Sequence, residues 1–187
     1  MKHDASNRAF TLIEILVVIA ILGILMAMSI PAANAILKRT KVSNARNDAG
    51  IVVSGLLQYR LEYSSWPDFA KGKGKKHFTD HEFVETMMPG GDGAPPAENL
   101  KRVRFIEGGA DVVAPGNAGG QDQFIDPWGN PFQYLVNETP RDTMGLGSFK
   151  GDYSGPEEIR ANVLVWSAGP DGDYSTWTDN VVSWPED

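Results

Sequence analysis

The sequence contains no cysteine and only three histidines among its 187 residues. The lack of cysteine excludes a disulfide framework and a thiolate metal site. Basic residues are also scarce: 17 Lys and Arg stand against 24 Asp and Glu, which gives a net charge of −7. This balance does not favour nucleic acid as the main partner, because phosphate binding needs a surplus of basic side chains.

Glycine and proline are plentiful by contrast, with 20 and 12 residues, and most of them lie beyond residue 66. Because these two residue types end regular elements, the second part of the chain is expected to be rich in turns. The first part differs. Its polar leader, residues 1–9, carries Lys2 and Arg8, and every residue from 15 to 28 is apolar or glycine.

This apolar run, counted from residue 10, is about as long as a helix that crosses a bilayer. Positive charge ahead of such a run keeps the leader in the cytoplasm and sends the rest of the protein outward. A secretory signal peptide is an alternative, because residues 32–35 resemble its cleavage site, although its apolar region is shorter. A simple membrane anchor would explain the length but not the carboxylate of Glu14.

The segment A-F-T-L-I-E at residues 9–14 resembles the cleavage and methylation signal of type IV pilins and of the pseudopilins of type II secretion. In that family a membrane peptidase cuts before the Phe and methylates the new amine. The resemblance therefore places the cut between Ala9 and Phe10 and makes residues 1–9 a cleaved leader. Glu14 and Pro31 then fall where the family has a glutamate and a helix-bending proline. One position differs from the cleavage signal of the family, which usually has glycine where this protein has Ala9.

The resemblance also implies a role for Glu14. An ionised carboxylate in hydrocarbon costs about 2.5 kcal/mol or more at mid-bilayer, so it needs a partner. Cleavage creates a positive amine on Phe10, and in a fibre Glu14 of one subunit would pair with that amine of its neighbour. Such a pair mainly fixes the register of assembly, because a stagger that leaves the charge unpaired is penalised. The alternative is that Glu14 simply lies at headgroup depth.

The spacing of apolar residues predicts one helix from about Phe10 to about Tyr63, roughly 80 Å long. Residues 10–33 form its transmembrane and assembly part, and residues 34–66 its amphipathic part. Residues 67–187 are expected to form an exported, β-rich globular domain with a variable surface insertion at about residues 68–123. The predicted fold class is α+β and pilin-like: a long N-terminal helix packed on a small antiparallel sheet.

Within the globular part, D-P-W-G-N-P at residues 126–131 is turn chemistry, and a strand is expected at residues 132–136. Further strands are predicted at residues 101–107, 163–166 and 181–184, and a short helix at residues 80–88. The segment 126–136 resembles an element of the major pseudopilin of type II secretion, as does the Trp66-Pro67 pair that ends the helix. Trp66 itself is expected to fill the core.

Two polar clusters carry weaker signals. The basic run K-G-K-G-K-K at residues 71–76 is interpreted as a solvated loop rather than a DNA-binding patch, since the rest of the protein is acidic. His77 and His81 have metal-ligand spacing if they lie on one helix, but no third ligand is evident. They are interpreted as polar surface.

The loop between the last two predicted strands is acidic and contains Asp171, Asp173, Asp179 and Asn180. Oxygen ligands on a flexible loop suit Ca²⁺, although the spacing is not that of an EF-hand. The loop is similar to one in major pseudopilins where Ca²⁺ pins the last loop to the sheet. By position, the three aspartates would be ligands, and Asn180 would offer an amide oxygen. A metal-free loop held by Asx-turns is the alternative.

Together these features predict a structural subunit of a type II secretion pseudopilus, with a subunit of a type IV pilus for adhesion, motility or DNA uptake as the alternative. The expected partners are further copies of the protein, other pseudopilins, the prepilin peptidase and the inner-membrane secretion platform. The expected location is the bacterial inner membrane with the globular domain in the periplasm, and after assembly a periplasmic fibre. An enzyme is not predicted, because no nucleophile–base–orienter set is visible.

Overall fold

The computed structural model describes residues 11–72, 74–90, 93–108, 112–115, 120–139, 143–147 and 151–185, and leaves undescribed the side chains of residues 28–32. Ala9 and Phe10, the predicted cleavage residues, lie outside the described residues. The protein divides into two units, Met1–Thr40 and Lys41–Asp187, which share one helix, α1 (Leu12–Tyr63). This helix confirms the long element predicted from periodicity.

In the first unit, every described side chain of α1 is exposed. Many of these side chains are large and apolar, for example Leu12, Ile19 and Met26, which are 84%, 60% and 68% exposed. Within the described residues, no helix combines the length and hydropathy that a membrane crossing requires. The first unit therefore presents a helix whose apolar surface its own described residues do not cover.

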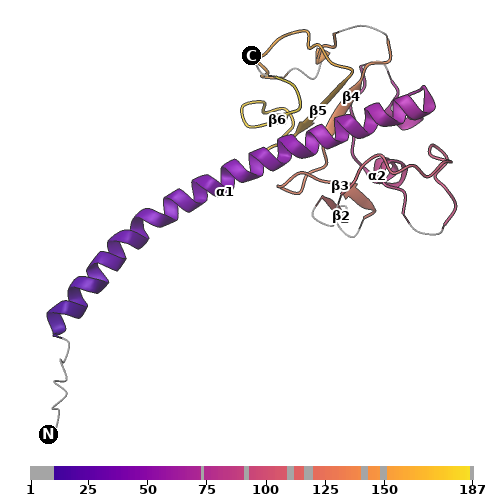
Figure 1. The fold of residues 1–187 in the computed structure, drawn as a ribbon. Coiled ribbons are helices and arrows are strands. Elements are labelled where there is room, and N and C mark those ends of the chain that lie inside the picture. The colour runs from indigo at the N-terminus through magenta and orange to yellow at the C-terminus, as the bar shows by residue number, and fades with distance from the viewer. Residues whose placement is uncertain are drawn as a thin grey trace. The chain divides into compact units, whose positions relative to one another are not determined.

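In the second unit, α1 buries one face (Figure 1). The buried apolar residues recur at alternating steps of four and three, which places them on one stripe of the helix. They are Ala45, Ala49, Val52, Leu56 and Tyr59. After Tyr63 the helix ends at Ser64, whose positive φ of 56° is typical of a helix C-terminus.

The main sheet has the order β1-β4-β5-β6, and all neighbours are antiparallel. Its strands are β1 (His77–Phe78), β4 (Gln133–Val136), β5 (Val163–Ser167) and β6 (Val181–Val182). Tyr134 of β4 pairs with Val165 of β5, and β5 is buried along its whole length. A second, two-stranded sheet joins β2 (Val113–Pro115) to β3 (Asp122–Phe124).

Two apolar clusters lie on the two faces of the main sheet. Side chains alternate along a strand, so Tyr134 and Val165 join the cluster that contains α1, while Leu164 joins the other. The second cluster is strongly aromatic and contains Tyr153, Trp166, Trp177 and Trp184. Trp66 belongs to the first cluster, as predicted, and its indole N–H donates to the carbonyl of Asn137 at 2.9 Å.

The segment between α1 and β4 corrects two expectations. Residues 68–123 do not form only a surface insertion, because α2 (His81–Met87) contributes Phe83 and Met87 to the first cluster. Residues 101–107 do not form a strand. The adjacent residues Phe105 and Ile106 are both buried and both donate a backbone N–H to the carbonyl of Met87. Successive N–H groups of a strand point to opposite sides, so two that share one carbonyl do not belong to a β-ladder.

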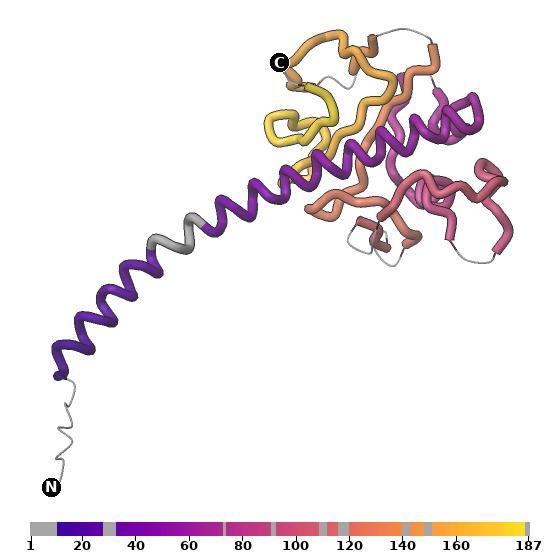
Figure 2. Tube along the Cα trace, viewed as in Figure 1, coloured from indigo at the N-terminus to yellow at the C-terminus, as the bar shows by residue number. Residues whose placement is uncertain are grey.

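Smaller elements complete the second unit. A short 3₁₀ helix, η1 (Asp68–Ala70), follows the end of α1. The predicted helix at residues 80–88 is confirmed as α2, and the side chain of Asp80 caps it by accepting from the Phe83 N–H at 3.2 Å. The strand expected at residues 163–166 is one residue longer, and the one expected at 181–184 covers only Val181–Val182. Figure 2 traces this path to the compact yellow C-terminal loop.

Candidate functional site

At the N-terminus of α1, Thr11 and Glu14 form a capping box. The hydroxyl of Thr11 accepts from the Glu14 N–H at 3.3 Å, and Glu14 Oε2 accepts from the Thr11 N–H at 2.7 Å. The hydroxyl of Thr11 also donates to Glu14 Oε2 at 2.8 Å. These bonds satisfy backbone donors that the first turn of a helix leaves unpaired.

This cap was not predicted, although its signal was present in the sequence. A capping box is indicated by a Thr that is followed three residues later by a Glu, just ahead of an apolar run. Glu14 therefore has a local role that is independent of any partner subunit. α1 continues through Pro31, whose side chain lies outside the described residues.

In the C-terminal loop, Asp171 and Asp173 form two successive Asx-turns. Asp171 Oδ1 accepts from the Asp173 N–H at 2.8 Å, and Asp173 Oδ1 accepts from the Ser175 N–H at 2.9 Å and from its hydroxyl at 2.7 Å. Both aspartates are exposed. The bonds from Ser175 lower the pKa of Asp173, because they stabilise its ionised form.

The next acidic position of the loop is different. Oδ1 of Asp179 and Oδ1 of Asn180 are both buried, and neither accepts a hydrogen bond from any of the described residues. The amide nitrogen of Asn180 donates to the Tyr174 carbonyl at 3.2 Å, which supports this orientation of the amide. A buried acceptor without a donor costs about 1–3 kcal/mol, and a cation would remove that cost. Two adjacent unsatisfied oxygens are thus the feature of this loop that fits a metal.

The predicted metal residues do not all come together. Among the residues that the structure describes, no group of three or more His, Cys, Asp or Glu side chains is arranged to hold a metal ion. Asp171 and Asp173 each use one carboxylate oxygen in an Asx-turn. The two unsatisfied oxygens belong to Asp179 and Asn180. The fit to Ca²⁺ therefore rests on Asp179 and Asn180, with carbonyl and carboxylate oxygens of the same loop as further candidates.

A buried carboxylate holds this loop in place. Asp126 is 2% exposed, and its Oδ1 accepts from the N–H groups of Trp128 and Asn130 at 2.9 Å each. Its Oδ2 accepts from the Ser167 hydroxyl at 2.5 Å, and that hydroxyl accepts from the Gly169 N–H at 3.0 Å. The turn at residues 126–131 was predicted, but its link to the loop was not.

Two further contacts close the loop against the same turn. The hydroxyl of Tyr174 donates to the Pro131 carbonyl. Gly169 has a φ of 67°, and a Cβ there would clash with the backbone carbonyl of Asp179, so only glycine fits. The start of the loop is therefore packed against the backbone of Asp179, and its middle is bonded to the turn at residues 126–131.

Burial raises the pKa of Asp126 in spite of its hydrogen bonds. Asp48, on the buried face of α1, is 8% exposed. Its pKa is also raised, first by burial and further by repulsion from the nearby charge of Asp126. Two buried carboxylates, one on α1 and one in the turn at residues 126–131, thus lie near enough for the charge of Asp126 to affect Asp48.

The two weaker polar clusters do not form sites. His77 lies in β1 and His81 begins α2, so the two histidines are not on one helix. His77 stacks on Tyr134 with a centroid separation of 5.6 Å, and His81 Nε2 lies 3.3 Å from Glu85 Oε1. In the basic run, Lys71 pairs with the exposed Asp68 three residues earlier. This pairing agrees with a solvated loop.

Comparison with known proteins gives a motif match at the N-terminal end of the sequence and alignments to several relatives. The model of the prokaryotic N-terminal methylation motif matches residues 4–30. The protein is similar to the fimbrial protein EcpC of Eikenella corrodens, with 32% identity over 82 residues, 44% of this sequence and 54% of that protein. No solved structure matches it significantly.

Longer matches come from one kind of protein. The type II secretion system core protein G of Pseudomonas aeruginosa is 30% identical over 144 residues, which cover 76% of this sequence and 84% of that protein. The protein of the same name from Escherichia coli K12 is 26% identical over 184 residues, 98% of this sequence and 95% of that protein. The methylation motif, the long helix with a small antiparallel sheet and these alignments agree, and the chain belongs to the family of type II secretion system core protein G.

Proposed function

We propose that the protein is a structural subunit of a type II secretion pseudopilus, processed by prepilin peptidase and assembled into a helical fibre that helps to export proteins. The observation that carries this proposal is the likeness to core protein G, which extends over the globular domain as well as the N-terminal motif. A type IV pilus subunit is less well supported, because the likeness to pilins covers less than half of the sequence.

The exposed apolar surface of α1 supports assembly. Large side chains such as Ile19, Leu22 and Leu25 are 60%, 50% and 56% exposed. Covering this surface is favourable by about 25 cal/mol per Å². We infer that lipid covers it before assembly, which anchors the subunit in the inner membrane with its globular domain in the periplasm, and that helices of neighbouring subunits cover it in the fibre.

Glu14 supports a defined register between subunits. Both Thr11 bonds use Oε2 of Glu14, and among the described residues Oε1 accepts no hydrogen bond. Oε1 is therefore available to the amine that cleavage creates on Phe10 of a neighbour. The pair is charge-assisted, and a subunit that docks out of register leaves both charges unpaired in an apolar surrounding. The protein thus acts by assembly rather than by catalysis.

The test is Glu14→Gln in a cell that carries the complete secretion system. Glutamine can still complete a capping box, so the substitution removes the charge and keeps the cap. We expect the leader to be cut while sheared fibres fall at least tenfold and secretion fails. Glu62→Gln, at the exposed far end of α1, is the control and should assemble normally. Normal fibres from Glu14→Gln would contradict the register mechanism.

A second experiment separates a pseudopilus from a pilus. Deletion of the protein should abolish export of secreted proteins and leave pilus-dependent motility and DNA uptake unchanged. The reverse result would contradict the proposed function and favour a type IV pilus. Crosslinking in the membrane fraction should recover further copies of the protein, other pseudopilins and components of the inner-membrane platform.

We also propose that Ca²⁺ binds the C-terminal loop, with Asp179 and Asn180 as ligands and Asp171 and Asp173 contributing oxygens. The two buried oxygens, for which the described part of the protein offers no donor, support this assignment. The ion would supply positive charge to these oxygens and hold the loop against the sheet. Binding to the folded state alone stabilises it by about 2.7 kcal/mol at a calcium concentration of 100 times Kd.

Asp179→Asn in the full-length protein tests the calcium proposal through two opposite results. Without calcium the variant should be at least as stable as the parent, because it removes a carboxylate whose buried Oδ1 has no donor among the described residues. With calcium the parent should gain several degrees in Tm and the variant much less. Asp122→Asn, at an exposed position of β3, is the control. If the Tm of the parent were the same with and without calcium, the proposal would be refuted.

A further inference from the structure

Two basic side chains lie near the C-terminal end of the first unit. Lys38 and Arg39 follow directly after Ile36 and Leu37 on α1, and all four side chains are exposed. Ile36 and Leu37 are each 63% exposed. Successive residues of a helix lie about 100° apart, so these four residues surround the helix rather than share one face. The exposed surface of α1 therefore changes from apolar to basic within about one turn.

No acidic residue lies near these two charges along the helix. After Glu14, the next acidic residue of the sequence is Asp48, which is well beyond the three or four positions over which helical side chains pair. No ion pair joins Lys38 or Arg39 to an acidic side chain among the described residues. Both charges are therefore accessible to an anion from outside the subunit.

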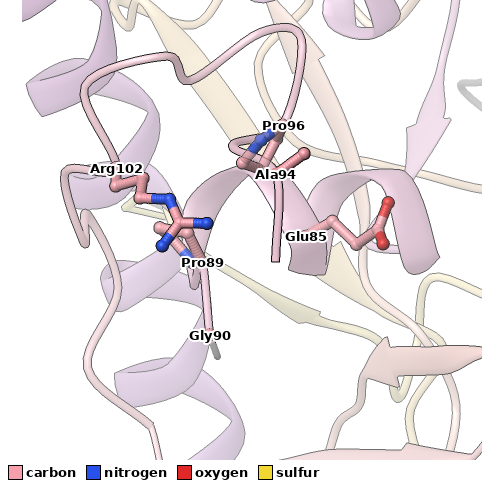
Figure 3. Close-up of a pocket in the computed structure, with 6 residues that line it drawn as sticks. All are labelled: Glu85, Pro89, Gly90, Ala94, Pro96 and Arg102. Carbon is pink, nitrogen blue, oxygen red and sulfur yellow. The ribbon is translucent and has the colours of Figure 1, made fainter. Parts of the chain in front are cut away.

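Several basic side chains of the second unit have acidic neighbours, by contrast. Three of them form ion pairs, namely Lys71 with Asp68, Lys101 with Glu62 and Arg104 with Glu107. Arg102 lines a cavity of about 100 Å³ to which Glu85 also contributes (Figure 3). The protein as a whole is acidic, with a net charge of −7. Lys38 and Arg39 thus differ from these residues, because no described acidic side chain balances their charge.

The segment that precedes Lys38 has the length of a bilayer. Residues 15–37 carry no charged side chain, and at ~1.5 Å per residue they extend for about 35 Å along α1. The hydrocarbon core of a bilayer is ~30 Å thick. When this segment lies in hydrocarbon, Lys38 and Arg39 are at the level of the lipid headgroups, where long basic side chains are stable.

We propose that Lys38 and Arg39 bind the phosphate groups of anionic membrane lipids. The inference rests on the membrane anchoring proposed above and names the lipid chemistry that α1 recognises. A guanidinium offers paired donors that match phosphate oxygens, and the lysine ammonium adds a point charge. A protein partner would cover one stripe of the helix, whereas headgroups surround it, which fits the exposure of all residues from 36 to 39. Binding fixes the level of α1 relative to the membrane surface.

NMR of the full-length protein in micelles of an uncharged detergent tests this inference. Three additions are compared: phosphatidylglycerol, diacylglycerol with the same acyl chains but no phosphate, and inorganic phosphate. We expect phosphatidylglycerol alone to shift the signals of the Arg39 Nε–H and the Thr40 amide. An equal shift with diacylglycerol would show that phosphate is not recognised. An equal shift with inorganic phosphate would show that the lipid is not required, and either result would overturn the proposal.

The amide signal of Gly23, within the apolar segment, separates this inference from the proposed function. A lipid-soluble spin label should broaden it. If Gly23 is broadened but Arg39 does not respond to phosphatidylglycerol, the helix lies in an apolar phase and only the recognition of phosphate is refuted. If Gly23 is not broadened, the membrane anchoring is refuted as well. A shift of Arg39 that grows with protein concentration without lipid would indicate a second copy as the partner and overturn the proposal.

Substitution of both residues gives a second readout. Lys38→Gln/Arg39→Gln removes the two charges, and glutamine keeps the helix propensity, so Tm should not change. Each basic residue near an anionic surface strengthens binding about fivefold, so the affinity for phosphatidylglycerol, measured at the Thr40 amide, should fall about 25-fold. Lys71→Gln/Lys75→Gln removes two exposed charges of the second unit and is the matched control, whose affinity should not change. Equal losses in the two variants would show an effect of net charge and refute the site.

Discussion

The two halves of α1 share one secondary structure and differ in what stabilises it. In the first unit, the described side chains are exposed, and those from Ile15 to Ala27 are all apolar. In the second unit, the same helix buries one narrow stripe, including Val52 and Leu56, against the globular domain. A helix that is apolar all round needs an apolar environment outside the domain, whereas an amphipathic helix packs its apolar stripe on the core of its own domain.

This difference predicts that substitutions in the two halves affect separate properties. Changes in the first half should affect assembly and leave the subunit stable. Changes in the second half should unfold the domain and affect assembly only as a consequence. Four predictions follow this contrast from the largest expected change in stability to the smallest.

The most direct test pairs two identical substitutions. Leu56 is fully buried and Leu22 is 50% exposed. Leu56→Ala should lower the free energy of unfolding by about 3 kcal/mol, because it removes buried methyl groups and leaves a cavity. Leu22→Ala should change it by less than about 0.5 kcal/mol. Urea unfolding followed by tryptophan fluorescence measures both, and equal losses would erase the contrast between the halves.

The second prediction asks whether polar contacts also hold the second unit. Asp126→Ala leaves the N–H groups of Trp128 and Asn130 and the hydroxyl of Ser167 without their acceptor. We expect a loss of about 2–3 kcal/mol, since each buried donor without a partner is costly. Amide hydrogen exchange should also quicken at Gly169. Asp122→Ala, at an exposed position, should change neither, and a stable Asp126→Ala variant would contradict the role of this carboxylate.

Two glycines of α1 sharpen the comparison within the second half. A Cβ at Gly55 would meet the side chain of Ile106 and lie 3.3 Å from the Phe105 carbonyl, whereas a Cβ at Gly50 would meet nothing within 4 Å. Gly50→Ala should therefore stabilise the fold by about 1 kcal/mol through helix propensity. Gly55→Ala should destabilise it by about 1 kcal/mol, because overpacking exceeds that gain. Opposite changes in Tm are the expected result.

The smallest effect concerns pH. The pKa of Asp48 is raised in the folded protein by burial and by the charge of Asp126. The contribution of Asp48 to stability is therefore full below its unfolded pKa and is lost as pH rises through its folded pKa. Asp48→Asn should remove this loss, so the variant gains Tm relative to the parent as pH rises above the unfolded pKa of an aspartate, about 4. A difference in Tm that is constant with pH would exclude Asp48 as the cause.

Much of the fold could be predicted because it depends on local pattern. The long helix follows from periodicity, the turn at residues 126–131 from its proline and glycine, and β5 from a run of branched residues. The sheet of β2 and β3 could not be predicted in this way. Its β3 strand begins with Asp122 and Gln123, and it is held from outside by Thr79, which bonds to both backbone groups of Phe124.

The candidate sites differ in the same way, because one depends on local sequence and the others on contacts across the domain. The capping box of Thr11 and Glu14 is local and was readable from spacing alone. The unsatisfied oxygens of Asp179 and Asn180 could not be predicted from local sequence. They matter because they are buried, and their burial arises from contacts across the domain. The hydrogen bond between Ser167 and Asp126 joins residues 41 positions apart, and sequence spacing does not predict a contact at that separation.

The position of β5 in the main sheet determines when the second unit can complete its fold. β5 lies between β4 and β6 and pairs with both, yet it begins at Val163, near the end of the sequence. Without that last stretch, β4 has an open edge and the aromatic cluster lacks Trp166, Trp177 and Trp184. The main sheet is therefore completed only when almost the whole sequence is available for folding.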